Sequence, residues 1–193
     1  MTLPIIVDTN VPLVAKGLSG FSDECLERCI DELTPIFEGE RCVVLDTGDR
    51  ILEEYMHKLS LSGQPSVGDA FLKWLFLNQA VEGCCEKVAI TAISEEEQVF
   101  REFPTDPELA TFDRSDRKFV AVACAHPARP VILEATDAKW VGWHVPLSRA
   151  GVEVRFVCDR EIRALYEKNY GKPKGKKQSA KKDPPSKVGS RRG

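Results

Sequence analysis

The chain has 193 residues, of which 42% are hydrophobic, and this composition suits one globular domain with a sizeable core. No apolar run reaches the 18 residues of a membrane span, and no secretory signal opens the sequence, so a cytoplasmic protein without membrane attachment is expected. The net charge is −3, but nine of the 27 Lys and Arg residues and only one of the 30 Asp and Glu residues lie in 171–193. The remaining chain is strongly acidic, which argues against a broad cationic surface for nucleic acid.

Short apolar runs alternate along the chain with segments of helical periodicity. Strands are expected at residues 3–7, 41–46, 87–93, 131–133 and 152–157. The first clear helix is expected to begin after the N-cap Ser22 and to be ended by Pro35 and Gly39. Further helices are expected at 51–59, at 71–76, after Ser94 (short and acidic), from Ser115 onward, within 140–150 and at 159–168. A turn-rich break is expected at 63–69. This alternation predicts an α/β fold with three layers, α/β/α, and a mainly parallel sheet of about five strands.

The composition changes after Gly171 to Lys, Gly, Pro and Ser without a core pattern. We therefore expect a folded domain at 1–170 and a basic, disordered tail at 171–193. Two interpretations of this tail stay open. It is either a tether that concentrates RNA near the acidic domain or an end that increases solubility.

The cysteines are odd in number and contain no Cys-x-x-Cys pair; they are Cys25, Cys29, Cys42, Cys84, Cys85, Cys124 and Cys158. We expect free thiols in a reducing compartment. Cys25 and Cys29 lie one helical turn apart and could bind a metal ion, but the sequence offers them no matching His or Cys partners.

Acidic residues recur where the predicted fold brings strand ends and helix starts to one rim. Asp8 ends the first strand, and further acids follow at Glu53, Glu54, Asp113, Asp116 and Asp137. Ligands of open α/β sheets bind beyond the carboxyl ends of the strands, and clustered carboxylates need a cation or a proton. Oxygen ligands suit Mg²⁺ or Mn²⁺, which can activate water for phosphodiester cleavage. The alternative is that these residues only cap helices or face solvent.

Four stretches in order resemble the motifs of the PIN domain, a family of metal-dependent nucleases. They are Val7-Asp8-Thr9-Asn10-Val11, Ile51-Leu52-Glu53-Glu54-Tyr55, Asp113-Arg114-Ser115-Asp116-Arg117-Lys118-Phe119-Val120-Ala121, and Ile132-Leu133-Glu134-Ala135-Thr136-Asp137. Together they cover about residues 3–158. The chain departs from the family at the fourth motif, where Thr136 directly precedes Asp137 instead of standing two residues before it.

The resemblance implies a PIN-like endoribonuclease that hydrolyses RNA with Mg²⁺ or Mn²⁺. It assigns catalytic roles to Asp8, Glu54, Asp116 and Asp137, and it makes these four and Asp113 the metal ligands. Glu54 is preferred to Glu53 because it directly precedes the aromatic Tyr55. Asn10, Arg117 and Lys118 are candidate substrate-binding residues, although Asn10 is equally suited to capping the following turn, and Arg117 and Lys118 to being exposed helix charges.

The implied partners are RNA or single-stranded DNA as substrate, an antitoxin or another regulator, and a second copy of the chain. Three biological roles are open: a toxin, a defence nuclease and a housekeeping nuclease. A second hypothesis is a PIN-fold module that binds nucleic acid or regulates without efficient chemistry. A third, a phosphatase of the haloacid-dehalogenase type, is disfavoured because Asn10 stands where that family needs a second Asp.

Overall fold

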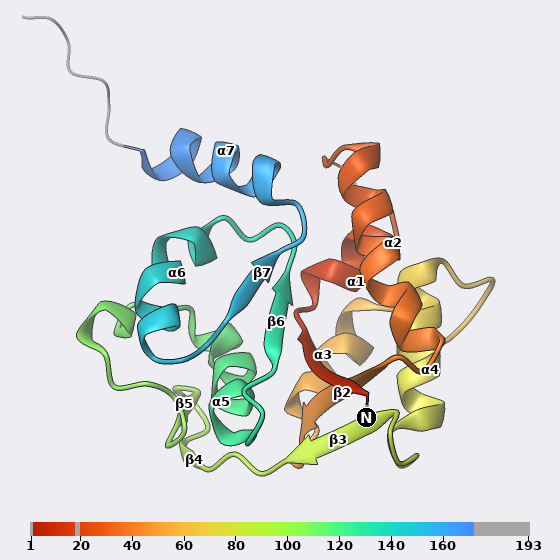
Figure 1. The fold of residues 1–193 in the computed structure, drawn as a ribbon, viewed down its shortest axis with the longest axis horizontal. Helices are drawn as coiled ribbons and strands as arrows, with labels where there is room; N and C mark the ends of the chain where they lie inside the picture. Colours follow the sequence, from red (N-terminus) through yellow and green to blue (C-terminus); the bar gives the residue numbers. More distant parts are fainter. Residues whose placement is uncertain (1, 18–19, 172–193) are drawn as a thin grey trace, which may run out of the picture.

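The computed structural model describes residues 2–17 and 20–171. A five-stranded, all-parallel sheet crosses the molecule (Figure 1), and it confirms the predicted fold class. Its strands, in spatial order, are β3 (Cys85–Val88), β2 (Arg41–Asp46), β1 (Leu3–Val7), β6 (Val131–Glu134) and β7 (Val154–Phe156). The first strand of the sequence is therefore the middle strand, and Ile5 aligns with Val43 on one side and with Val131 on the other. The predicted basic tail lies outside the described residues, apart from Gly171.

Helices cover both faces of this sheet and give the three layers that Figure 1 shows. On one side lie α1 (Asn10–Ala15), α2 (Asp23–Phe37) and α4 (Val67–Asn78), and on the other lie α5 (Arg117–Ala125) and α6 (Lys139–Arg149). The helix α3 (Arg50–Lys58) packs against β2 and α5, while α7 (Asp159–Tyr170) packs on α6. None of the helices in 2–17 or 20–171 has the length and apolar character needed to cross a bilayer.

Buried side chains fix the carboxyl ends of the central strands. Ile6 and Val7 have no exposed surface, as expected for a parallel strand covered on both faces. The Tyr55 hydroxyl in α3 donates to the main-chain oxygen of Val7, and the Tyr55 ring packs edge-on against Phe71 of α4. These contacts fix the carboxyl end of the central strand, so the residue after Val7 lies at the rim where ligands of such sheets bind.

The region after β3 differs from the sequence prediction. The predicted strand 87–93 is two elements, because β3 ends at Val88 and a separate strand, β4 (Ala92–Ser94), pairs antiparallel with β5 (Val99–Phe100). The acidic helix expected after Ser94 is the connection of this hairpin. Gln98 adopts a left-handed backbone conformation there, with φ of 52°, which reverses the chain instead of extending a helix.

Two helix boundaries also differ. The break predicted at 63–69 ends earlier, since the Ser66 hydroxyl accepts the amide of Asp69 and starts α4 at Val67. The helix α2 begins after Ser22 as predicted, but it continues past Pro35 to Phe37.

A disulfide joins Cys25 in α2 to Cys158, which directly precedes α7. The Cα atoms of these buried residues lie 5.2 Å apart, although 133 positions separate them in the sequence. The expectation that every cysteine is a free thiol is therefore wrong for this pair, because the sequence does not show that the turn after β7 meets α2. The Sγ atom of Cys29 lies 4.0 Å from that of Cys158. Cys158 is thus the third cysteine beside Cys25 and Cys29, which the sequence alone did not identify.

Breaking this disulfide is expected to lower the free energy of unfolding by about 2–4 kcal/mol, because the cross-link restricts the unfolded chain over a long loop. Urea denaturation with and without TCEP measures the effect, and the Cys25→Ala/Cys158→Ala chain should match the reduced wild type. Cys84→Ser, which removes a free thiol, should keep the full response to TCEP. Equal stability of the oxidised and reduced wild-type chains would refute the cross-link.

Candidate metal centre

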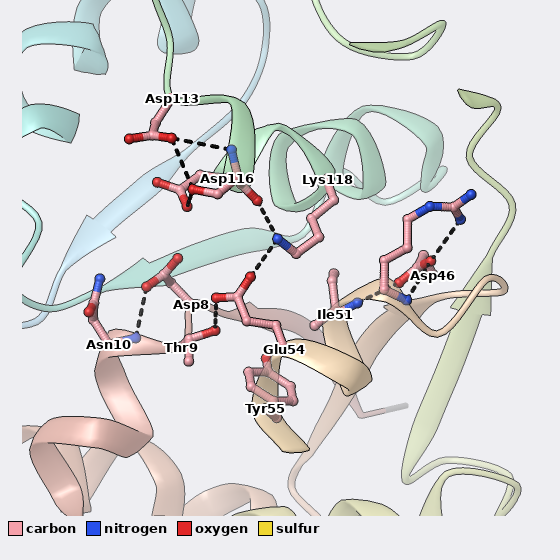
Figure 2. Close-up of polar contacts among 12 residues, drawn as sticks. Asp8, Thr9, Asn10, Asp46, Ile51, Glu54, Tyr55, Asp113, Asp116 and Lys118 are labelled. Carbon is pink, nitrogen blue, oxygen red and sulfur yellow. Dashed lines mark hydrogen bonds and ion pairs between the residues drawn. The ribbon is translucent and has the colours of Figure 1, made fainter. Parts of the chain in front are cut away.

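The five predicted metal ligands come together in one cavity of about 660 Å³ at the carboxyl ends of the central strands. They are Asp8, Glu54, Asp113, Asp116 and Asp137. Figure 2 shows the first four of them around a common space, with Asp8 and Glu54 on one side and Asp113 and Asp116 on the other. These residues come from four segments that are far apart in the sequence, and the parallel sheet is what assembles them.

Asp8 lies at the floor of the cavity, where β1 ends. Its amide donates to the Leu133 carbonyl at 2.9 Å, which continues the pairing of β1 with β6. Its Oδ1 accepts the amide of Asn10 at 2.8 Å, so the start of α1 orients the carboxylate. Burial, together with repulsion from Glu134 and Asp116, raises the pKa of Asp8 well above its usual value.

Asp113, Asp116 and Asp137 form the tightest group, since each can place one carboxylate oxygen within 4.8 Å of the others. Asp113 and Asp137 also cap turns, because they accept the amides of Ser115 at 3.2 Å and Lys139 at 2.9 Å. Asp113 and Asp137 can therefore cap turns and also belong to a metal site.

Asp116 is held by two donors. Its Oδ2 accepts from the Trp140 indole at 3.1 Å, and its Oδ1 accepts from the Ser115 hydroxyl at 3.0 Å. Burial nevertheless raises the pKa of Asp116 to about 6, and repulsion from Asp113 and Asp137 adds to the effect. A cation in the cavity would favour the ionised form of this carboxyl group.

Glu54 faces the cavity with both oxygens engaged. Its Oε1 accepts from the Thr9 hydroxyl at 2.6 Å, and its Oε2 lies 2.5 Å from the ammonium of Lys118, which is buried (Figure 2). Glu53 also lines the cavity, but its side chain is exposed. Thr9 and Lys118 therefore connect Glu54, and not Glu53, to the ends of β1 and α5.

Glu134, the last residue of β6, is a buried acid that the sequence reasoning passed over. Its Oε1 accepts the amides of Thr136 at 2.8 Å and Asp137 at 2.6 Å, which holds the loop that carries Asp137. Its Oε2 is buried and has no hydrogen-bond partner among the described residues. Burial raises the pKa of Glu134 to about 7, and repulsion from Asp137 adds to it. The sequence feature that could have identified Glu134 as a site residue is its position directly after the apolar run 131–133.

Lys139 is the second residue that sequence reasoning missed. Its ammonium lies 2.5 Å from Asp113 and 3.7 Å from Asp137. The hydrogen bond between Lys139 and Asp113 lowers the pKa of Asp113 and raises the pKa of Lys139. Its only sequence signal was its place two residues after Asp137, which is also ordinary for a solvated helix start.

The three candidate substrate-binding residues separate in space. Asn10 lines the cavity, and Lys118 lines it while paired with Glu54. Arg117 is not among the residues of this cavity: its guanidinium lies 5.3 Å from the centre of the Phe103 ring and donates to the Ala110 carbonyl at 3.1 Å. The structure therefore brings Asn10 and Lys118 to the acidic group and directs Arg117 elsewhere.

Comparison of the chain with protein-family models, with curated proteins and with solved structures finds no match. The chemistry of the cavity is therefore inferred from its lining residues. The acidic side chains that line the cavity offer carboxylate oxygens, which suit a hard divalent cation such as Mg²⁺ or Mn²⁺.

Proposed function

We propose that the chain is a Mg²⁺- or Mn²⁺-dependent endoribonuclease with a PIN-like active site. The observation that supports this most is the convergence of Asp8, Glu54, Asp116 and Asp137 in one cavity at the carboxyl ends of the sheet. Burial raises the pKa of Asp8 and Asp116, and repulsion from neighbouring carboxylates adds to both shifts, as expected for a site that a cation would stabilise.

The residues of the cavity divide into two groups in this proposal. Asp8, Asp113, Asp116 and Asp137 would hold the cation, with Glu54 beside them. When bound, such a cation supplies an activated water and stabilises the leaving oxygen of a phosphodiester. The chain's own amide of Asn10 orients Asp8, and the Trp140 indole orients Asp116.

The basic side chains have distinct roles. Lys118 is buried and fixes Glu54, so we assign it a positioning role. Lys139 is half-exposed at the edge of the cavity, where its ammonium can exchange a carboxylate for a substrate phosphate.

A specific observation also favours the alternative, a PIN-fold module that binds nucleic acid or regulates without efficient chemistry. Lys118 and Lys139 already neutralise part of the acidic group by pairing with Glu54, Asp113 and Asp137. Such a module would need no cation. The two functions therefore differ in their response to metal.

Cleavage of a fluorescently labelled single-stranded RNA by the purified full-length chain tests the proposal. We expect internal cleavage with Mg²⁺ or Mn²⁺, no cleavage in EDTA, and recovery when Mn²⁺ is restored. Thermal denaturation in parallel should show stabilisation by Mn²⁺, because a ligand bound only by the folded chain raises its stability. RNA binding without metal-dependent cleavage, and without stabilisation by Mn²⁺, would support the regulatory module instead.

A further inference from the structure

A second hollow adjoins the acidic cavity, and the proposed function does not use it. It has a volume of about 380 Å³ and is lined by Thr111, Lys139, Gly142, Trp143, Tyr166 and Tyr170. Lys139 lines both spaces, so the hollow begins where the acidic cavity ends. None of its six lining residues is acidic, in contrast to the cavity beside it.

Helical spacing builds this hollow from two helices that pack on each other. Lys139, Gly142 and Trp143 are three and four residues apart in α6, and Tyr166 and Tyr170 are four apart in α7, so each set shares one helix face. Figure 1 shows α7 beside α6. A Cβ atom on Gly142 would come within 2.9 Å of the Tyr166 hydroxyl oxygen, so the absence of a side chain lets the tyrosine lie close to α6.

The rings of the hollow pack on neighbouring rings while part of their surface stays open. The Trp143 ring packs on Phe112, with 4.7 Å between the ring centres, and its side chain is half-buried. The Tyr166 and Tyr170 rings lie 5.3 Å apart at 35°, and Tyr170 is 53% exposed. Rings fixed on one side and open on the other form a platform on which a flat, uncharged group can stack.

We propose that this hollow binds an unpaired nucleobase of the RNA strand whose phosphodiester lies at the acidic cavity. This inference rests on the proposed nuclease function and adds a substrate class, RNA with a single-stranded segment. Aromatic side chains beside a cationic side chain are the usual means of binding single strands. The bases stack on the rings, and the cationic side chain contacts the phosphate backbone. Lys139 supplies the cation at the junction of the two spaces.

The base would have to be unstacked from its neighbours to enter. Bases in an RNA duplex are paired and stacked inside the helix, whereas loops and single strands present them. The sequence that follows Tyr170 carries nine Lys and Arg residues, which favours a polyanion near this end of the chain. A hollow that takes neutral, unpaired bases thus fits a single strand better than a duplex.

Fluorescence anisotropy with a labelled 12-nucleotide single-stranded RNA in EDTA tests this proposal on the full-length chain. We expect Tyr170→Ala to weaken binding about tenfold and Tyr170→Phe to retain it, because stacking needs the ring and not the hydroxyl. Phe76→Ala is the matched control, since Phe76 is 51% exposed on α4 and away from the hollow. In the cleavage assay with Mn²⁺, Tyr170→Ala should raise KM about tenfold and change kcat little.

An oligonucleotide with abasic sites separates base stacking from phosphate contacts. It should bind the wild-type chain about tenfold more weakly than the intact strand, and Tyr170→Ala should not weaken its binding further. Equal or tighter binding of the intact strand by Tyr170→Ala, as expected if the hollow holds the chain's own basic end, would overturn the proposal. Tyr170-dependent binding without any metal-dependent cleavage would support the base site and reject the nuclease. Metal-dependent cleavage that does not depend on Tyr170 would support the nuclease and reject the base site.

Discussion

Asp116→Asn is expected to reduce metal-dependent RNA cleavage by about 10³-fold or more, which corresponds to about 4 kcal/mol of transition-state stabilisation. The carboxylate of Asp116 is central to the group that would hold the cation. An asparagine can accept from the Trp140 indole and donate to the Ser115 hydroxyl, so the replacement removes charge while keeping the local bonds. Asp8→Asn should behave in the same way, because its amide oxygen can still accept from the Asn10 amide. Initial rates with Mn²⁺ measure both effects.

The matched control is Asp31→Asn, which removes an exposed carboxylate on α2, away from the cavity. Its activity should equal that of the wild type. Far-UV circular dichroism and thermal denaturation of all three variants establish that the fold is kept. Full activity in folded Asp8→Asn and Asp116→Asn would place the chemistry elsewhere on the molecule.

Glu134→Gln is expected to stabilise the metal-free chain and to weaken Mn²⁺ binding by about 10–100-fold. The glutamine keeps an acceptor for the amides of Thr136 and Asp137, and it places an amide donor where the unpartnered Oε2 lies beside Asp8. The mutual repulsion of Glu134 and Asp8 then disappears, which stabilises the fold when no cation is present. The same change removes a negative charge from the shell around the cation.

The direction of the pH dependence follows from the raised pKa values. In the folded chain the pKa of Asp116 is about 6 and that of Glu134 about 7, both above their unfolded values. The folded state therefore binds more protons than the unfolded state between about pH 4 and pH 7, and the free energy of unfolding falls as the pH rises through this window. Glu134→Gln should reduce this fall and be more stable than the wild type at pH 8 by about 1–3 kcal/mol.

Urea denaturation in EDTA at pH 5 and pH 8, with calorimetric titration of Mn²⁺, measures both consequences. Glu153→Gln serves as the control, because Glu153 is exposed just before β7. This control should follow the wild-type chain at both pH values. A Glu134→Gln variant that is less stable than the wild type at pH 8, and that binds Mn²⁺ equally well, would show that Glu134 is only a structural acceptor.

The sequence predicted those parts of the site that depend on chain order and strand direction. An apolar run that ends in Asp8 is a strand with a carboxylate at its carboxyl end, and the structure puts it in the middle of the sheet. Because the strands are parallel, Asp137 after β6 had to reach the same rim. The helix start that carries Asp116 reached that rim as well.

The rest could not be predicted because it depends on contacts between distant segments. Glu134 follows an apolar strand, and only its position next to Asp8 shows that it is buried with an unpartnered oxygen. The pairing of β4 with β5 replaced the helix expected after Ser94, since local propensity cannot foresee a hairpin partner. The bond between Cys25 and Cys158 is a similar case, because spacing in the sequence says nothing about a contact across 133 residues.

The most direct measurement is an anomalous difference map from crystals of the chain soaked in MnCl₂. The account predicts a manganese peak within coordinating distance of the carboxylates of Asp8, Asp116 and Asp137, and its loss in Asp116→Asn crystals. An empty acidic cavity at saturating Mn²⁺, with the ammonium of Lys139 still on Asp113 and Asp137, would contradict the account.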